Sequence, residues 1–343
     1  MLLWADHLIS PLMNESKTVT IGAVAIGRNE GVRLEACLKS LLRVVDTVVY
    51  VDSGSTDDSV AMAKSLGVTV VDLDTSIPFT AARARNAGYS ELMGKISNKD
   101  SALVQFVDGD CEVAEGWIDA ASAFLLNNKE VASVCGRRRE RHPADSVFNR
   151  LCDIEWDTPV GEAKSTGGDF LVRSKAFDSV EGFNPGLIAG EEPDLCYRLR
   201  ENEWKIWRLD QEMTRHDAAM TKLSQWWQRN KRAGYAYANG YFLHGAPPER
   251  FRMREVMRSA VFGAGLPLAV IVGLIFEGPA AFLLLLIYGM QVARTFMKRG
   301  DLGEGRFAYA MSCTFAKVPE AFGILKFRLD RLRGSQSGLI EYK

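Results

Sequence analysis

The fold is decided by the stretch Gln105-Phe106-Val107-Asp108-Gly109-Asp110-Cys111. It closes an apolar run, 102–107, that is typical of a buried strand in a parallel sheet, and α/β folds bind ligands at the carboxyl ends of such strands. Asp108 and Asp110 are therefore expected at a strand exit, where Gly109 lets the backbone turn tightly. Two carboxylates this close suit a hard divalent cation that bridges the protein to a diphosphate, and an ordinary Asp-Gly turn is the alternative.

The composition of the 343 residues is that of a folded protein, with 47% hydrophobic and 25% charged residues. The net charge of −1 does not favour nucleic acid as a partner. The six cysteines are scattered without the spacing of a zinc site, and residues 1–17 lack a basic segment before an apolar core. We therefore expect reduced thiols, no signal peptide and a location on the cytoplasmic side.

Strands and helices alternate over residues 19–136. Strands are expected at 19–26, 47–51, 68–71, 102–107 and 131–136, and helices at 34–42, 79–92 and 114–126. This alternation predicts βαβ units with right-handed connections and a mostly parallel sheet. The first helix is not preceded by GxGxxG, so a dinucleotide cofactor is not indicated.

Polar residues follow several of these strands. Asp52 ends the second strand, where it could accept hydrogen bonds from a base or ribose, or could cap the turn that follows. Arg83, Arg85 and Asn86 lie close together on one helix, where they could reach a diphosphate or form a solvated face.

An acidic cluster, Gly190-Glu191-Glu192-Pro193-Asp194, opens a later helix. Proline and acids suit a helix start, but capping explains one carboxylate and not three. A general base in a partly buried cleft is therefore the second interpretation. His216 follows an expected strand at 205–209, near the ligand side of the sheet, either as a structural histidine or as a ligand.

Four motifs occur in a definite order: Asp52 with Ser-Gly-Ser-Thr-Asp, Arg83-Ala-Arg-Asn86, Asp108-Gly-Asp110, and Glu191-Glu192 ahead of a helix. This order resembles the family-2 glycosyltransferases of the GT-A fold, which are inverting enzymes that use nucleotide sugars. The similarity covers residues 18–240 and is closest to bacterial members associated with exopolysaccharide and other surface glycans. The Gln-x-x-Arg-Trp motif of processive relatives is not reproduced around 225–232, which favours transfer of a single sugar.

The resemblance implies a role for each motif. The nucleotide-sugar would be held by Asn29, Glu30, Asp52, Arg83, Arg85, Asn86 and Asp108, with Gly168 and Asp169 shaping the wall around the donor sugar or the acceptor. Asp110 would coordinate Mn²⁺ or Mg²⁺, with Asp108 and His216 as further metal ligands. Glu192 matches the catalytic base by position. The family usually has Glu-Asp at this pair, so Glu191 remains the alternative base.

The carboxyl-terminal third contains two nearly uncharged segments, 259–276 and 280–293, which are expected to span a hydrocarbon core of ~30 Å, if only just. Basic residues flank the pair on both sides, so both ends are expected to face the cytoplasm. A re-entrant hairpin and a buried hairpin of a soluble protein are the alternatives. Apolar residues at spacings of three and four over 307–332, mixed with Lys and Arg, predict a basic amphipathic helix that lies in a membrane interface or packs on the catalytic domain or a second subunit.

These expectations define three regions: a GT-A catalytic domain at 1–240, a membrane hairpin at 241–300, and an interfacial helix and tail at 301–343. The function expected from the resemblance is metal-dependent inverting transfer of one sugar, from a UDP-sugar, to a lipid-linked or glycan acceptor at the cytoplasmic face of the inner membrane. The alternatives are a polyprenyl-phosphate glycosyltransferase and a non-catalytic sugar-nucleotide-binding scaffold. Membrane lipid and a second copy of the chain are the other expected partners.

Overall fold

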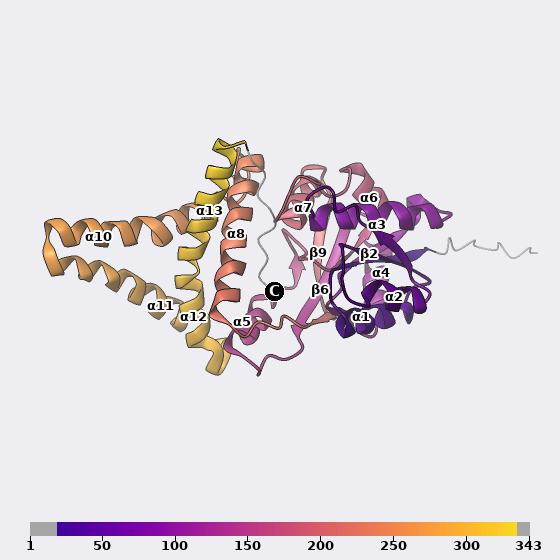
Figure 1. Ribbon diagram of the computed structural model, residues 1–343, viewed down its shortest axis with the longest axis horizontal. Coiled ribbons are helices and arrows are strands. Elements are labelled where there is room, and N and C mark those ends of the chain that lie inside the picture. Colours follow the sequence, from indigo (N-terminus) through magenta and orange to yellow (C-terminus); the bar gives the residue numbers. More distant parts are fainter. Residues whose placement is uncertain (1–18, 335–343) are drawn as a thin grey trace, which may run out of the picture.

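A single mixed sheet of nine strands forms the core of the computed structural model, which describes residues 19–334 (Figure 1). Residues 1–17, where no signal peptide was expected, lie outside the described residues, and so does the end of the tail beyond 334. The strand order is β3-β2-β1-β4-β8-β6-β9-β5, and β7 pairs with β9. The strands are β1 Ile21–Gly27, β2 Thr47–Asp52, β3 Thr69–Asp72, β4 Leu103–Asp108, β5 Cys111–Val113, β6 Val131–Glu140, β7 Gly161–Glu162, β8 Phe170–Arg173 and β9 Lys205–His216.

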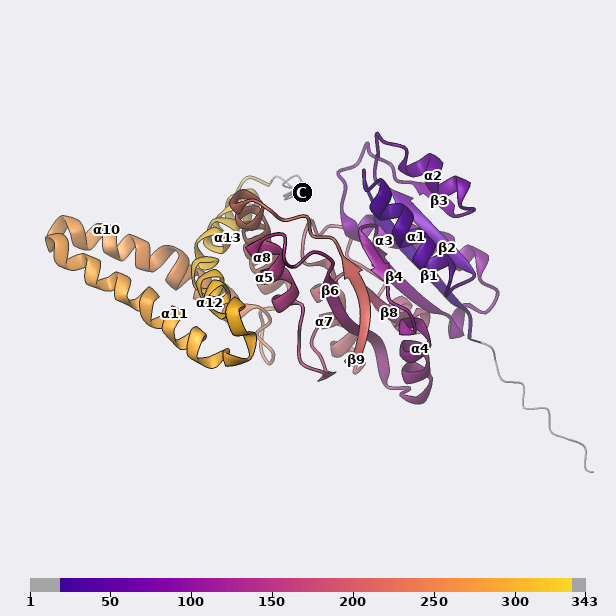
Figure 2. The same cartoon turned by 90° about the horizontal axis from the view of Figure 1, so that it is seen from below.

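The expected βαβ units are confirmed in the amino-terminal half. β1 pairs in parallel with β2 and β4, and β2 pairs in parallel with β3. The helices of this half are α1 Val32–Leu42, α2 Ser59–Ser65, α3 Ala81–Lys95, the 3₁₀ turn η1 Lys99–Ser101 and α4 Trp117–Asn127. Figure 2 shows α1 and α3 beside β1, β2 and β4, whose interior residues are almost fully buried, as continuous apolar runs require.

The second half departs from the expected strands. β6 runs to Glu140 and β9 to His216, well past the expected ends at 136 and 209, and β5 was not expected. β6 and β9 pair in parallel with register shifts between Val131 and Ser133 and on both sides of Arg137. The register shifts break the alternation of apolar and polar residues along β6 and β9, so the full length of these strands is not visible in the sequence. β5 has only three residues, which is too short for a recognisable pattern. β5, β7 and β8 pair antiparallel, which makes the sheet mixed.

Short helices complete the sheet domain. They are α5 Val147–Glu155, α6 Ser174–Ser179 and α7 Glu191–Glu201. α7 begins at Glu191, directly after Gly190, as the proline and acids at this point predicted.

The carboxyl-terminal helices form a layer and a projecting hairpin (Figure 1). They are α8 Leu223–His244, α9 Met253–Ser259, the π turn η2 Ala260–Gly265, α10 Leu266–Phe276, the 3₁₀ segment η3 Gly278–Leu285, α11 Leu286–Lys298, the 3₁₀ segment η4 Gly300–Gly305, α12 Arg306–Phe315 and α13 Lys317–Leu332. α8, α12 and α13 lie beside the sheet domain, and α10 and α11 extend away from it. The hairpin is mostly exposed, so the buried hairpin of a soluble protein is not what the structure shows.

α13 packs along α8, which is one of the arrangements that the sequence left open. A Cβ on Gly323 of α13 would lie 2.0 Å from the Lys231 carbonyl oxygen, and a Cβ on Gly234 of α8 would lie 2.0 Å from that of Glu320, so both glycines permit the close approach. α8 is continuous through residue 240, where the catalytic domain was expected to end. The amphipathic stretch expected as one helix is divided into α12 and α13, with Pro319 in the first turn of α13, where its missing N–H is not needed.

Candidate active site

A cavity of about 750 Å³ opens at the carboxyl ends of β1 and β4. Its walls come from the loop after β1, the turn after β4, the start of α7, and α8. The predicted site residues that line it are Asn29, Glu30, Arg85, Asp108, Asp110, Gly168, Glu191, Glu192 and His216. The structure thus brings residues from distant parts of the chain into one cleft.

The Asp108-Gly109-Asp110 turn depends on its glycine. Gly109 N donates to the Ile26 carbonyl at 2.8 Å, and a Cβ on Gly109 would lie 3.0 Å from the same oxygen. β4 therefore ends in close contact with β1, and β5 begins at Cys111. The stretch is a tight Asp-Gly turn, and both of its carboxylates line the cleft.

Arg85 joins two acidic parts of the site. Its guanidinium bonds to Asp108 Oδ1 at 2.6 Å and to Glu191 Oε1 at 2.8 Å. Burial alone would lower the pKa of Arg85, but the charges of Asp108 and Glu191 outweigh it and raise this pKa. Arg85 is therefore a permanent buried cation that ties α3 to the end of β4 and to α7.

Arg138 is a cleft residue that the sequence analysis missed. Its guanidinium lies 2.7 Å from Asp169 Oδ2 and 3.6 Å from Asp108 Oδ2, and it stands 5.4 Å over the ring of Trp156. Burial opposes its charge, but the neighbouring acids, Asp169 first, raise the pKa of Arg138. The signal was present as three consecutive arginines, 137–139, but only the extended β6 shows where they point.

Asp169 lies beneath the cleft and does not line it. Its side chain is fully buried, accepts from the backbone N–H of Asp108 at 3.1 Å and from the Thr214 hydroxyl at 2.7 Å, and pairs with Arg138. Asp169 therefore holds the end of β4 in place.

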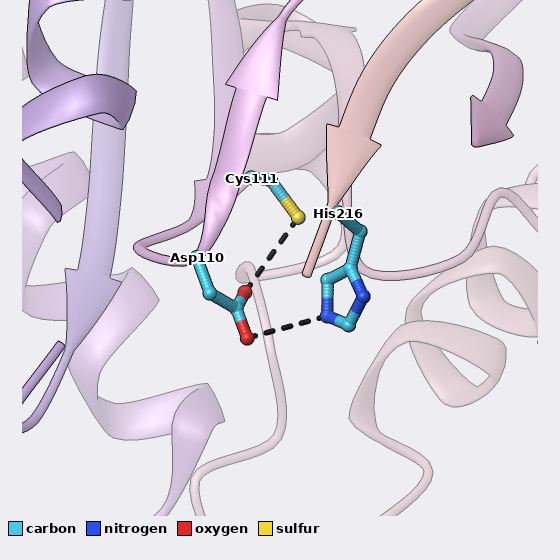
Figure 3. Close-up of side chains that lie close together, drawn as sticks. All are labelled: Asp110, Cys111 and His216. Carbon is cyan, nitrogen blue, oxygen red and sulfur yellow. Dashed lines mark hydrogen bonds and ion pairs between the residues drawn. The ribbon is translucent and has the colours of Figure 1, made fainter. Parts of the chain in front are cut away.

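Asp110 and His216 meet because β5 and β9 pair antiparallel, with Cys111 opposite His216 (Figure 3). His216 Nε2 lies 3.2 Å from Asp110 Oδ2, and one ligand atom from each of Asp110, Cys111 and His216 lies within 4.8 Å of the others. A buried carboxylate and imidazole facing the cleft are a donor set that fits Mn²⁺. Burial raises the pKa of the Cys111 thiol, and a soft thiolate is in any case a less suitable ligand for a hard ion than a carboxylate or an imidazole.

Glu140 stands behind His216. Its Oε2 lies 3.8 Å from His216 Nδ1, and its carboxylate accepts from the backbone N–H groups of His142 and Ala218 at 3.0 Å each. Burial acts to raise the pKa of Glu140, but the interactions with His216 and with these amides prevail and lower it. The 3.8 Å separation is longer than a hydrogen bond, so Glu140 faces the imidazole as a nearby buried charge.

The acids at the start of α7 have different partners. Glu191 bonds to Arg85. Glu192 Oε1 accepts from the backbone N–H of Thr166 at 2.5 Å, from its hydroxyl at 2.8 Å and from the Cys196 thiol at 3.0 Å. Asp194 bonds to Arg198 at 2.8 Å and to His244 Nε2 at 2.7 Å. Side-chain capping of α7 does not account for the cluster, because Gly190 occupies the N-cap position.

Asp52 serves the turn that follows it. Its carboxylate accepts from the Tyr50 hydroxyl at 2.7 Å, from the backbone N–H groups of Gly54 and Ser55 at 2.9 and 2.8 Å, and from the Ser55 hydroxyl at 2.5 Å. The capping interpretation therefore describes its contacts, and Asp52 does not line the cleft. Its role in nucleotide binding stays a prediction.

Arg83 and Asn86 also hold loops. The Arg83 guanidinium donates to the carbonyls of Asp74, Ile77 and Pro78 at 3.1, 2.9 and 2.8 Å. The Asn86 amide exchanges two hydrogen bonds with the backbone of Phe183, at 2.7 and 3.0 Å. Neither side chain lines the cleft, in contrast to Arg85 between them. Their predicted contacts with a nucleotide remain untested.

The far wall of the cleft is basic. Arg229 and Arg232 of α8 and Arg252 before α9 line it, together with Tyr237 and Phe251. The Arg252 guanidinium stands 5.3 Å over the Tyr237 ring and pairs with Glu255 at 2.9 Å. The sequence around 228–232 is visibly basic, but its place in the cleft depends on how α8 packs.

Known proteins resemble this chain in sequence and in fold. A family model described as glycosyl transferase family 2 matches residues 24–162. An uncharacterized glycosyltransferase of Rickettsia conorii is 46% identical over 59 residues, which are 17% of this chain and 21% of that protein. The chain thus matches only about a fifth of the length of the first curated relatives.

Two further similarities extend over more of the chain. The O-antigen chain rhamnosyltransferase of Salmonella typhimurium is 20% identical over 226 residues, covering 60% of this chain and 69% of that protein. A mannosyltransferase from Pyrobaculum calidifontis, solved in complex with GDP-Man and Mn²⁺, is similar in structure with a TM-score of 0.60 at 16% identity, over 89% of this chain and 86% of that one. This structural likeness shows a shared fold.

Proposed function

Because this chain belongs to the family-2 glycosyltransferases and has their GT-A fold, we propose that it transfers one sugar from a nucleotide-sugar to an acceptor hydroxyl, with inversion at the anomeric carbon. The observation that carries the proposal is the meeting of the Asp110–His216 pair, the Arg85 bridge and Glu192 in one cleft. An inverting transfer needs positive charge at the departing diphosphate and a base on the opposite side of the sugar. The three elements must therefore lie close together.

Asp110 and His216 are the proposed ligands of Mn²⁺ or Mg²⁺, with Asp108 beside them. When bound, such an ion neutralises the charge of the departing diphosphate. Arg85 and Arg138, both held by buried acids, add permanent positive charge near the same place. The Mn²⁺ in the mannosyltransferase of similar fold supports this choice of ion.

Glu192 is the proposed general base. The Glu191 carboxylate is paired with Arg85, whereas the hydrogen bonds to Glu192 come from the neutral donors Thr166 and Cys196. Glu192 would take the proton of the acceptor hydroxyl. At the same time the acceptor oxygen would bond to the anomeric carbon, and the bond from that carbon to the diphosphate would break. One displacement of this kind inverts the anomeric centre and releases a nucleoside diphosphate.

The donor is proposed to be a UDP-sugar, as the resemblance implies. Asn29 and Glu30 line the cleft at the loop after β1 and would hold the nucleoside. Asp52, Arg83 and Asn86 are proposed as further nucleotide contacts on the resemblance alone. Gly168 lies close to Asp108, because a Cβ on it would stand 2.8 Å from Asp108 Oδ2. The glycine permits this close approach, and the wall that it forms is the proposed place of the donor sugar.

The hairpin is proposed to insert into the inner membrane, with the catalytic domain on the cytoplasmic side. Helical segments of 24 and 21 residues, Met253–Phe276 and Gly278–Lys298, are long and apolar enough to cross a membrane, and they are mostly exposed. The similarity to an O-antigen rhamnosyltransferase supports a lipid-linked or glycan acceptor and a role in surface polysaccharide synthesis. Pairing of two copies through the exposed apolar faces is the alternative use of this region.

The test is nucleotide release by the full chain in detergent from UDP-, GDP- and dTDP-sugars, with membrane lipid extract as acceptor source and with Mn²⁺, Mg²⁺ or EDTA. We expect release from one donor that requires metal and is abolished in Asp110→Ala. A polyprenyl-phosphate acceptor needs no base, so in that case Glu192→Gln would keep most of the activity. Nucleotide binding without turnover on any extract would indicate a sugar-nucleotide-binding scaffold.

A further inference from the structure

A second cavity, of about 290 Å³, lies where α8, α9, α12 and α13 meet. The charged residues that line it are Arg229, Arg258, Lys317, Glu155 and Glu320. Arg229 pairs with Glu155 at 2.5 Å, and Lys317 pairs with Glu320 at 2.7 Å. Arg258 forms no ion pair with any residue of the described range 19–334, so the cavity has one cation more than it has acids.

This cavity adjoins the catalytic cleft. Arg229, Ala233 and Tyr237 of α8 line both. On the cleft side of the same helix, Arg232 continues the basic wall. A ligand with an anionic group in the second cavity can therefore extend past α8 into the cleft that Glu192 also lines.

The cavity also lies at the root of the hairpin. Arg258 directly precedes the uncharged segment 259–276, and Lys317 begins α13. α10 and α11 leave the helical layer on the side away from the sheet domain (Figure 1). With the hairpin in a bilayer, the root of the hairpin stands at the level of the lipid headgroups, where the phosphates of membrane lipids are found.

We propose that the second cavity binds the phosphate or diphosphate group that links a membrane lipid to the acceptor sugar. The apolar chain of this acceptor would lie in the bilayer beside the hairpin, its phosphate among Arg229, Arg258 and Lys317, and its sugar hydroxyl in the cleft at Glu192. The acids Glu155 and Glu320 hold two of the cations in place, and Arg258 supplies the charge that they leave uncompensated. The inference rests on the proposed function and names its acceptor class.

The experiment measures binding to the full chain in detergent, with EDTA present so that a metal at Asp110 does not attract the probes. The probes are farnesyl diphosphate, which has lipid and phosphate, farnesol, which has only the lipid, and inorganic diphosphate. We expect farnesyl diphosphate to bind at least about tenfold more tightly than either of the others, because only it engages both the cations and the apolar surface.

The variant Arg258→Gln should weaken farnesyl diphosphate binding about tenfold, which is the effect of one charge-assisted contact. Arg254→Gln is the matched control, because Arg254 is an exposed arginine of the same helix that lines neither cavity, and it should bind as the wild type does. Both side chains are exposed, so neither change is expected to affect folding.

Three results would overturn the proposal. Equal binding of farnesol would mean that apolar surface alone attracts the probe, and equal binding of inorganic diphosphate would identify a site for free phosphate. Unchanged binding by Arg258→Gln would place the probe elsewhere. Metal-dependent nucleotide binding, measured on the same preparation, reports on the donor site alone, so a failure of the proposed function and a failure of this inference are distinguishable.

Discussion

Thr166 donates two hydrogen bonds to one oxygen of Glu192, from its backbone N–H at 2.5 Å and from its hydroxyl at 2.8 Å. The two residues are 26 positions apart, and the contact ties the loop before β8 to the first turn of α7. Cys196, one helical turn beyond Glu192, donates to the same oxygen at 3.0 Å. Glu192 is thus a nearly buried carboxylate whose orientation is set by neutral donors.

This contact predicts that Thr166 positions the base. Thr166→Val removes the hydroxyl and keeps the shape, so we expect kcat to fall about fivefold, as the loss of roughly 1 kcal/mol implies, with little change in the KM for the donor. Thr166→Ser keeps the hydroxyl and should retain near-normal kcat. Steady-state kinetics of both variants and their pH profiles test the role, and a Thr166→Val enzyme with normal kcat and pH profile would contradict it.

The metal ligands can be told apart by substitution. Asp110→Ala and His216→Ala should weaken Mn²⁺ binding by at least the 10–100-fold that is typical even for residues behind the ligands. Cys111→Ala should bind Mn²⁺ as the wild type does, because this ion prefers carboxylate and imidazole ligands to a thiol. Electron paramagnetic resonance of bound and free Mn²⁺ measures this, and a large loss in Cys111→Ala would show that the thiol is a ligand.

Arg85 is expected to be important for stability as well as for the site. Arg85→Met leaves Asp108 and Glu191 without their shared cation, and breaking a buried pair in this way costs about 3–5 kcal/mol. Urea denaturation should show a loss of this order, and Arg85→Lys should be intermediate because an ammonium cannot bond to both acids in the same geometry. Arg83→Met, on the same helix, removes hydrogen bonds to loop carbonyls only, and it should lose less. The opposite ranking of the two methionine variants would count against a structural role for the Arg85 bridge.

The proposed membrane hairpin predicts sensitivity to charge. Ile271 of α10 is 58% exposed in the structure, and an arginine there would cost about 2.5–3.5 kcal/mol at the centre of a bilayer. Flotation of cell membranes should find less Ile271→Arg protein bound to them than wild type. Val147→Arg is the control, since Val147 is an exposed residue of α5 in the sheet domain. Equal flotation of the wild type and Ile271→Arg would argue against insertion of α10.

The crossing of α8 and α13 predicts a steric effect. Gly323→Ala places a methyl group 2.0 Å from the Lys231 carbonyl, so the helices must separate, and overpacking of this kind costs about 1–3 kcal/mol. Gly289→Ala in α11 is the control, because a Cβ there meets nothing within 4 Å. Thermal unfolding in detergent should rank Gly323→Ala clearly below Gly289→Ala. Equal melting temperatures would mean that the two helices do not pack as tightly as described.

Local sequence was sufficient for the amino-terminal half. Apolar runs predicted β1, β2 and β4, and the acids that end the last of them were placed at a strand exit because parallel strands share one carboxyl edge. The same local reasoning could not tell which of two nearby arginines faces the cleft. Arg85 lines it, whereas Arg83, two positions earlier, binds loop carbonyls. A helix turns about 200° between these positions, and only the packing of α3 on the sheet decides which of them faces inward.

By itself, the sequence determined the α/β class, the order of the motifs, the two apolar segments of the hairpin and the residue types that a nucleotide-sugar and a metal require. Tertiary structure alone decided which of these residues meet. The antiparallel pairing of β5 with β9 puts His216 beside Asp110, the extended β6 brings Arg138 to Asp108, and a loop contact brings Thr166 to Glu192. These contacts join residues 26 to 106 positions apart in the chain, and no periodicity within a short window can encode a partner at that distance.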